Sequence, residues 1–305
     1  MNGIIPLYKE RGLTSFDCVA KLRHILHTKK VGHSGTLDPG VDGVLPICIG
    51  SATKVVPYLM ASGKVYRGQV TLGFATTTED LEGDEVTRQA LTRPFTAAEL
   101  QAAAAHLTGT IQQTPPMYSA VKVHGRKLYE YARAGETVER PTRTITVTAF
   151  TLKDAGSFDA ATGTQTIDFE VSCSKGTYVR TLAVDLGRQL QVPAVMASLT
   201  RLKSGGFTLD QAVTLDQVAA AMADDDLTTV LRPIDYALQD YPHVALSDKL
   251  WGLVKNGVFL SPAELSVDPN TVATVALSYQ GETKCLYQWS TEKQQYKPLK
   301  MFAVD

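Results

Sequence analysis

The chain has 305 residues, of which 44% are hydrophobic and 20% charged, and its formal net charge is -1. This length and composition fit one large domain carrying a small one, and they exclude a single small module and a mainly disordered chain. No apolar run reaches the ~18 residues that a membrane span needs, and the first residues lack the order of a signal peptide, so we expect a cytoplasmic protein.

The amino-terminal third predicts a helix, a shaped loop and a strand in that order. Thr14 and Asp17 have the spacing of a capping box, and apolar residues then recur at helical intervals, which predicts a helix over about 15–27. Five glycines and two prolines in residues 32–54 indicate a loop that leads into a short apolar strand at 44–49. Alternating apolar and polar residues predict a further strand over 66–73.

The middle of the chain mixes strands and helices without a regular period. Thr96 and Glu99 begin a second predicted helix, which ends near Gly109. Two neighbouring segments have the alternation of paired strands, and a third helix follows them; these elements cover 143–154, 164–173 and 177–190. We therefore expect an α+β fold with a mixed, largely antiparallel sheet flanked by helices.

An acidic, proline-containing stretch over 223–242 indicates a boundary, because short strands and turns dominate after it. We expect a larger domain over 1–235 and a small β-rich domain over 240–305. The four cysteines lie far apart and lack zinc-ligand spacing, so we expect reduced structural thiols and no metal site.

Positive charge is concentrated in two segments. Residues 1–33 hold six Lys or Arg against two acids, and residues 119–143 hold six against three, interleaved with tyrosines. Such segments are typical of nucleic-acid binding, although solvated helix and loop faces give the same composition.

Asp38 is the strongest candidate for a catalytic group. It stands in the glycine-rich loop before Pro39, which restricts it to extended conformations. The loop lacks the lysine spacing of a phosphate-binding P-loop and the ligand series of a calcium loop. The structural alternative is a turn whose aspartate caps a backbone N–H.

The same loop, GHSGTLDP followed by GVLPICIGSATK, closely resembles the motif that bears the catalytic aspartate of the bacterial TruB-type tRNA pseudouridine-55 synthases. The resemblance continues in order through residues 64–84, 115–143, 173–187 and 199–207. It implies the pseudouridine synthase fold, with residues 240–305 as a PUA-like accessory RNA-binding domain and a basic segment near 115–143 that clamps RNA.

The resemblance implies an isomerase that converts uridine 55 in the T loop of tRNA to pseudouridine, without cofactor or metal. Nothing in the sequence demands more than a monomer. The target base must leave its stack before a protein group can reach it. Asp38 would then attack ribose C1', add to C6 of the ring, or remove a C2' proton; the sequence does not choose among these routes.

The resemblance also assigns the partners of Asp38. Arg180 in CSKGTYVR matches the arginine that pairs with the aspartate, and Tyr66 matches the active-site tyrosine. Leu199 matches an apolar residue that closes the pocket, and His33 matches a histidine that contacts RNA near the vacated position. Read alone, these residues are ordinary helix-surface, core and loop residues.

Further RNA contacts are expected from one group of basic and aromatic residues, which comprises Lys9, Lys64, Lys122, Arg126, Lys127, Arg143, Lys175 and Tyr178. The chain departs from the family pattern at Glu10, Val41, Asp42 and Thr200. We expect the Asp42 carboxylate to point outward, away from Asp38, and Thr200 to cost one RNA contact.

Two other functions compete with this reading. One is a tRNA-binding or chaperone protein without catalysis, which would need no set such as Asp38, Tyr66 and Arg180. The other is a nucleoside or glycoside hydrolase that uses Asp38 with a second carboxylate such as Asp42 or Asp185, and it would release free uracil.

Overall fold

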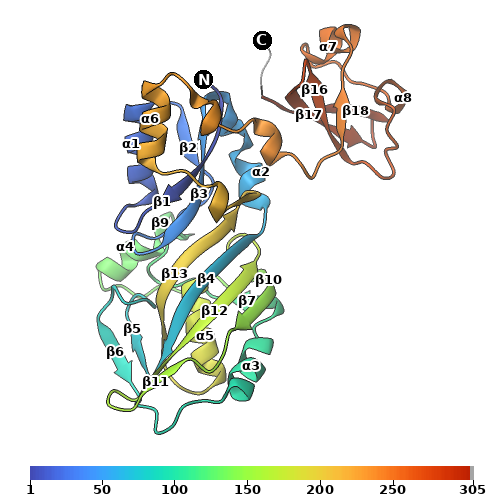
Figure 1. Cartoon of the computed structure of the whole chain (residues 1–305). Helices are drawn as coiled ribbons and strands as arrows, with labels where there is room; N and C mark the ends of the chain where they lie inside the picture. Colours follow the sequence, from blue (N-terminus) through green and yellow to red (C-terminus); the bar gives the residue numbers. More distant parts are fainter. Residues whose placement is uncertain (303–305) are drawn as a thin grey trace.

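The computed structural model describes residues 1–302, which form a large sheet with its helices and a smaller carboxy-terminal unit (Figure 1). No helix in this part of the chain is long and apolar enough to cross a membrane. The large sheet runs in the order β1 (Gly3–Lys9), β3 (Asp42–Ile49), β13 (Ala194–Ser204), β4 (Lys64–Leu72), β12 (Thr164–Cys173), β10 (Arg143–Leu152) and β7 (Gly109–Gln113).

Most neighbours in this sheet are antiparallel, and only β3 and β13 pair in parallel along the main path. Three short strands extend it, β2 (Val31–His33) on β3, β11 (Ser157–Asp159) on β12 and β14 (Phe207–Thr208) on β13. Two small hairpins lie apart from it, β5 (Phe74–Thr76) with β6 (Glu85–Arg88) and β8 (Lys122–Val123) with β9 (Arg126–Lys127). The predicted α+β class and mixed sheet are confirmed.

The alternation of side chains along each strand explains why both faces of the sheet are covered. In β12, Ile167, Phe169, Val171 and Cys173 all point to one buried face, as the sequence predicts. In β1, Ile5 and Leu7 join the main core, whereas Ile4 belongs to a second cluster on the other face.

The helices begin where their capping residues predict. In α1 (Ser15–Ile25) the Thr14 hydroxyl accepts from the Asp17 N–H, and in α3 (Ala97–Ala105) Thr96 and Glu99 repeat this arrangement. The third predicted helix is α5 (Val179–Gln189). The remaining helices of the large unit are α2 (Val56–Ala61), α4 (Leu128–Arg133) and α6 (Leu215–Ala223), with 3-10 turns at Gly50–Val55, Leu209–Gln211, Leu227–Thr229 and Ile234–Ala237.

The carboxy-terminal unit has a four-stranded sheet and a core of its own. Its strands are β15 (His243–Ala245), β16 (Thr274–Tyr279), β17 (Glu282–Ser290) and β18 (Gln295–Met301), with helices α7 (Asp248–Val254) and α8 (Pro262–Leu265). This confirms a small β-rich unit, while the division at 235/240 stays a prediction. Residues 303–305 of the predicted domain lie outside the described residues.

This smaller unit packs beside α2, as Figure 1 shows. The Lys54 ammonium donates to the carbonyls of Met301 and Phe302, each at 3.1 Å, and the ring of Tyr58 meets Phe302 edge to face. The two units therefore share an apolar and hydrogen-bonded contact.

Candidate active site

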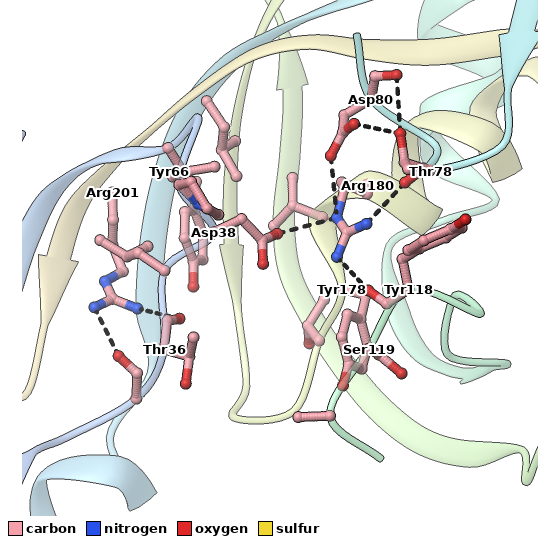
Figure 2. Close-up of a pocket in the computed structure, with 18 of the residues that line it drawn as sticks. Thr36, Asp38, Tyr66, Thr78, Asp80, Tyr118, Ser119, Tyr178, Arg180 and Arg201 are labelled. Atoms are coloured by element: carbon pink, nitrogen blue, oxygen red, sulfur yellow. Dashed lines mark hydrogen bonds and ion pairs between the residues drawn. The ribbon is translucent and has the colours of Figure 1, made fainter. Parts of the chain in front are cut away.

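A cavity of about 620 Å³ opens in the large unit, where several segments distant in sequence converge (Figure 2). Its lining comes from residues 35–41, the start of β4, the turn at 78–82, residues 118–133, the start of α5 and the middle of β13. A cavity of this size is typical of sites that enclose a small ligand or a single nucleotide.

Asp38 lies in the loop between β2 and β3, and the surrounding backbone holds that loop in place. The buried hydroxyl of Ser15 accepts from the Leu37 N–H at 2.8 Å and donates to its carbonyl at 3.2 Å. The Gly12 N–H donates to the Pro39 carbonyl at 2.9 Å, so Asp38 is anchored on both sides. Its side chain is 43% exposed and reaches into the cavity (Figure 2).

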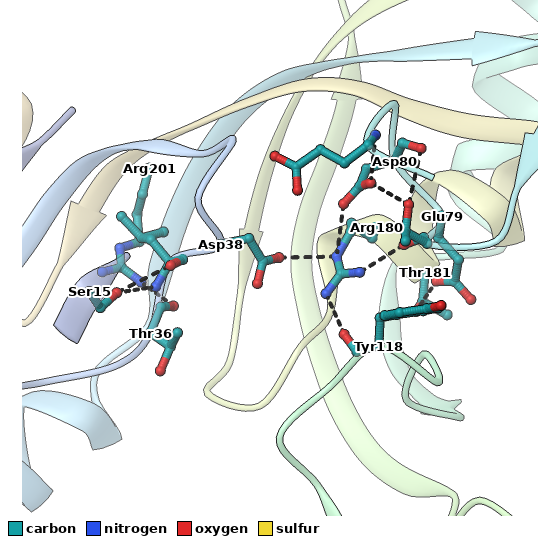
Figure 3. A network of polar contacts seen from close by, with 12 residues as sticks. Ser15, Thr36, Asp38, Glu79, Asp80, Tyr118, Arg180, Thr181 and Arg201 are labelled. Carbon is teal, nitrogen blue, oxygen red and sulfur yellow. Dashed lines mark hydrogen bonds and ion pairs between the residues drawn. The ribbon is translucent and has the colours of Figure 1, made fainter. Parts of the chain in front are cut away.

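Arg180, the second residue of α5, approaches Asp38 and is itself held from every side. Its Nε lies 3.1 Å from Asp38 Oδ2 and 3.7 Å from Asp80 Oδ2, and the side chain is only 7% exposed. Its two other nitrogens donate to the carbonyls of Thr78 at 2.7 Å (Figure 2) and Tyr118 at 2.9 Å (Figure 3). The guanidinium therefore fixes one carboxylate oxygen of Asp38 and leaves the other directed at the cavity.

The start of α5 is positioned by a buried amide. The side chain of Gln113 donates to the Tyr178 carbonyl at 3.0 Å and accepts from its N–H at 2.8 Å. Because Gln113 is 1% exposed, this buried pair ties β7 to Tyr178, the residue just before helix α5.

Asp80 is a site residue that sequence reasoning missed, because residues 64–84 were matched to the family as a whole and this aspartate was not singled out. Glu79 adopts a left-handed conformation with φ of 66°, which turns the chain sharply at this point. Its carboxylate accepts from Thr181 Oγ1 at 2.7 Å, and burial raises its pKa above the ordinary value. This contact fastens the turn that carries Asp80 to helix α5.

Tyr66 on β4 and Leu199 on β13 form an apolar part of the lining, and both are less than 10% exposed. Burial raises the pKa of the Tyr66 hydroxyl, and the charge of the nearby Arg201 opposes that shift. Arg201 is the cross-strand partner of Tyr66 and was also missed. Arg201 lies two residues after Leu199 on the same strand, so the alternation that predicts a buried leucine also predicts that the arginine points to the same face.

Arg201 and Lys64 lie on the opposite side of Asp38 from Arg180. Arg201 is 1% exposed, and its guanidinium donates to the carbonyls of Val44 at 2.7 Å, Gly35 at 3.2 Å and Thr36 at 3.4 Å. Lys64 is 9% exposed, and burial together with Arg201 lowers its pKa to about 8.

The structure corrects the prediction for Lys9. This residue is 0% exposed, and its ammonium donates to the carbonyls of Glu10 at 3.1 Å, Leu13 at 2.6 Å and Pro39 at 3.4 Å. The expected RNA contact is wrong because the lysine is enclosed at the end of β1, where it holds the Asp38 loop.

The other predicted RNA residues divide into two groups. Lys64, Lys175 and Tyr178 line the cavity with Asp38, Tyr66, Arg180 and Leu199. His33, Lys122, Arg126, Lys127 and Arg143 do not line it.

Arg126 and Lys127, which lie outside the cavity, have local partners of their own. Arg126 pairs with Glu136 at 2.9 Å and lies over the ring of Tyr131, and Lys127 lies over Tyr129. His33 is partly buried, its Nδ1 has no hydrogen-bond partner among the described residues, and burial lowers its pKa.

Asp42 and Thr200, two residues at which the chain departs from the family pattern, form a hydrogen bond with each other. Thr200 Oγ1 donates to Asp42 Oδ1 at 2.6 Å, Tyr8 donates to Oδ2 at 2.8 Å, and Arg11 lies 3.6 Å away. Asp42 does not line the main cavity, as expected, but its carboxylate is only 14% exposed. It points into this network and not into solvent, because three neighbours supply donors.

The carboxylates proposed for a hydrolase are not at the site. Neither Asp42 nor Asp185 lines the cavity, and Asp185 pairs with Arg188 at 2.6 Å. Within residues 1–302 no group of three or more potential metal ligands comes together, and the four cysteines are buried and unpaired.

Comparisons with known proteins identify the family of this chain. Residues 23–179 match the model of the TruB family pseudouridylate synthase N-terminal domain, and residues 180–239 match the tRNA pseudouridylate synthase B C-terminal domain. Two proteins named tRNA pseudouridine synthase B, from Levilactobacillus brevis and Lactiplantibacillus plantarum, are 81% and 62% identical over the full length of both chains.

Solved structures show the same fold. A chain of a Cbf5-Nop10-Gar1 complex has a TM-score of 0.72 at 25% identity, with 99% of this chain and 85% of that chain covered. A chain of an H/ACA RNP bound to a substrate RNA has a TM-score of 0.71 at 22% identity, with the same coverage. The fold, the family models and the full-length relatives lead to one conclusion: this chain is an enzyme of the TruB family of pseudouridylate synthases.

Proposed function

We propose that this enzyme converts uridine 55 in the T loop of tRNA to pseudouridine, with Asp38 as the essential carboxylate. The observation that carries the proposal is the ion pair of Asp38 and Arg180 inside a cavity of nucleotide size. The names of the full-length relatives support tRNA as the substrate.

The reaction is an isomerisation in which nothing is added to the uridine. The bond from ribose C1' to N1 breaks, the uracil turns, C1' bonds to C5, and the proton on C5 is lost while N1 gains one. The carboxylate of Asp38 starts this sequence at C1', at C6 of the ring, or at the C2' proton. Arg180 holds one carboxylate oxygen, so the other is presented to the nucleotide without reorganisation.

The remaining lining residues serve the extruded base. Tyr66 offers its ring for stacking and its hydroxyl to the C5 proton, while Leu199 excludes water beside it. A base inside the stack of a folded loop cannot reach Asp38, so the target uridine flips into the cavity at a cost of a few kcal/mol.

The basic residues outside the cavity hold the rest of the T arm. His33, Lys122, Arg126, Lys127 and Arg143 contact RNA around the vacated position and along the backbone, and Lys175 and Tyr178 do so at the cavity mouth. Phosphate contacts of this kind make binding weaken steeply with salt.

The test is release of tritium from tRNA transcript labelled at uracil C5, measured for the wild type and for Asp38→Asn. We expect release by the wild type alone, with no free uracil, and no release when cytidine replaces uridine 55. Tight, salt-sensitive tRNA binding without release would favour the non-catalytic binder instead, and free uracil would favour the hydrolase.

A further inference from the structure

The charges that line the main cavity are unevenly distributed. Its lining includes the cations Lys64, Arg133, Lys175, Arg180 and Arg201 and the acids Asp38, Asp80 and Glu82. Arg180 serves two of the acids, Asp38 and Asp80. On the other side of Asp38, Lys64 and Arg201 form no ion pair with any carboxylate in residues 1–302 (Figure 2 shows Arg180 and Arg201 flanking Asp38).

Lys64 and Arg201 lie close together around Gly35. A Cβ built on Gly35 would lie 3.8 Å from Lys64 Cε and 3.9 Å from Arg201 Nη1. Both cations therefore come within van der Waals range of the same backbone position, and the φ of +113° at this glycine is one that residues with a side chain rarely adopt. Two buried like charges without an acid repel one another and lose hydration, which an anion placed between them would relieve.

Both side chains also keep donors that the protein does not use. The Lys64 ammonium has three N–H groups and donates to the carbonyls of Met60 and Ser62, each at 3.2 Å. Arg201 has five and directs three of them to the carbonyls of Val44, Gly35 and Thr36, and its guanidinium also hydrogen-bonds the Tyr66 side chain. Unused donors therefore remain on both cations at one wall of the cavity.

Phosphate is the only anionic group that a nucleotide carries. With the ribose C1' at Asp38, the phosphodiesters on O3' and O5' of the same ribose lie within one sugar's length of that carboxylate. We propose that Lys64 and Arg201 form a phosphate subsite inside the cavity, which receives one of the two phosphodiesters flanking the target uridine. This inference rests on the proposed function and assigns one part of its substrate to one wall of the site.

The subsite differs from the surface contacts expected of the basic segments. Lys64 and Arg201 are both at least nine-tenths buried, so a phosphate there leaves water and meets a desolvated charge pair. Such a contact is stronger per charge than one at an exposed lysine, and it is less sensitive to salt.

The experiment is a double-substitution cycle with a T-arm RNA. Each flanking phosphodiester in turn is replaced by a neutral methylphosphonate, and binding is measured in an Asp38→Asn background that prevents turnover. We expect one of the two replacements to weaken binding about tenfold, the size of one hydrogen bond to a charged group. Lys64→Met should weaken binding of unmodified RNA by a similar factor. In that variant, the methylphosphonate that weakened binding before should have almost no further effect.

Matched variants make the outcome specific. Lys64→Arg keeps the charge and should keep the methylphosphonate penalty, and so should Lys153→Met, which removes an exposed lysine away from the cavity. If Lys64→Met does not fold, Lys64→Gln takes its place. The subsite would be overturned if the loss of affinity from Lys64→Met and the loss from each methylphosphonate multiplied independently at both phosphates. Wild-type affinity in Lys64→Met would overturn it as well.

The proposed function is checked separately in the same preparation. Wild-type enzyme with unmodified RNA should release tritium from C5. If the wild type converts uridine to pseudouridine but the Lys64→Met and methylphosphonate effects on binding are independent, only the phosphate subsite is refuted. If the wild type converts no uridine, the proposed function is refuted.

Discussion

Replacing Asp38 by asparagine should separate chemistry from stability and from RNA binding. The carboxylate is 43% exposed and meets Arg180 at 3.1 Å, so the pair has one solvated partner. Its loss should cost less than about 1 kcal/mol of unfolding free energy, which is the range of exposed ion pairs. Arg180 would keep Asp80 at 3.7 Å and two carbonyls, so its position should change little.

The chemical step should respond very differently. Because the proposed reaction requires the carboxylate itself, single-turnover conversion at saturating enzyme should fall by at least about 10³-fold. The assay is tritium release from C5-labelled tRNA, read beside filter binding and calorimetry. We expect the dissociation constant within a few-fold of the wild type and a Tm change below about 3 °C.

Asp42→Asn is the matched control, because it removes a carboxylate four positions away that lies outside the cavity. Its conversion rate should stay within a few-fold of the wild type. The reasoning would be refuted if Asp38→Asn kept a tenth of wild-type activity, or if both variants lost activity alike.

Three further predictions concern charge and packing. Burial opposes ionisation of Asp42, but hydrogen bonds from Thr200 and Tyr8 lower its pKa overall, so the carboxylate stabilises the fold above about pH 4 and loses that contribution as pH falls. The stability gap between wild type and Asp42→Asn should narrow as pH falls below about 4 in urea titrations, and a gap that does not change with pH would contradict this. Burial, Arg201 and Lys175 lower the pKa of Lys64 to about 8, and Cys173 opposes this shift only in part. Because Lys64 then loses its charge as pH rises from 7 to 9, RNA affinity should fall over that range. Lys64→Met should flatten this pH dependence, and an unchanged slope would show that another group titrates. A Cβ on Gly43 would lie 2.2 Å from the Arg201 carbonyl oxygen at φ of +113°, so Gly43→Ala should cost more than about 2 kcal/mol; Gly252→Ala, which meets nothing within 4 Å, should be neutral or slightly stabilising in the same thermal melts.

The elements that depend on local chemistry were predictable from the sequence. The Thr14 and Asp17 capping box gives the start of α1, and the apolar alternation in residues 164–173 gives β12 and its buried face. These signals act within a few residues, so the sequence contains all of their physical cause.

The contacts between distant segments were not predictable in the same way. Asp80 reaches Arg180 only because Glu79 turns the chain through a left-handed conformation and bonds to Thr181, about a hundred residues later. Lys9 has the sequence context of a surface lysine. The three backbone carbonyls that accept from its ammonium are brought together only when the loop folds, so the sequence alone does not indicate its burial. Asp38 and Arg180 were linked by family resemblance, since nothing in their own spacing brings them together.

The place of β4 in the middle of the sheet has a consequence for dynamics. Residues 65–72 are hydrogen-bonded to β12 on one side and to β13 on the other, and this strand carries Tyr66. Its amide protons should exchange with solvent only through global unfolding, whereas the loop bearing Asp38 and the segment 118–133 lie off the sheet and can open locally. Bound RNA should therefore slow exchange in those segments and leave β4 nearly unchanged, so that a rigid platform receives the base while its rim closes around the nucleotide.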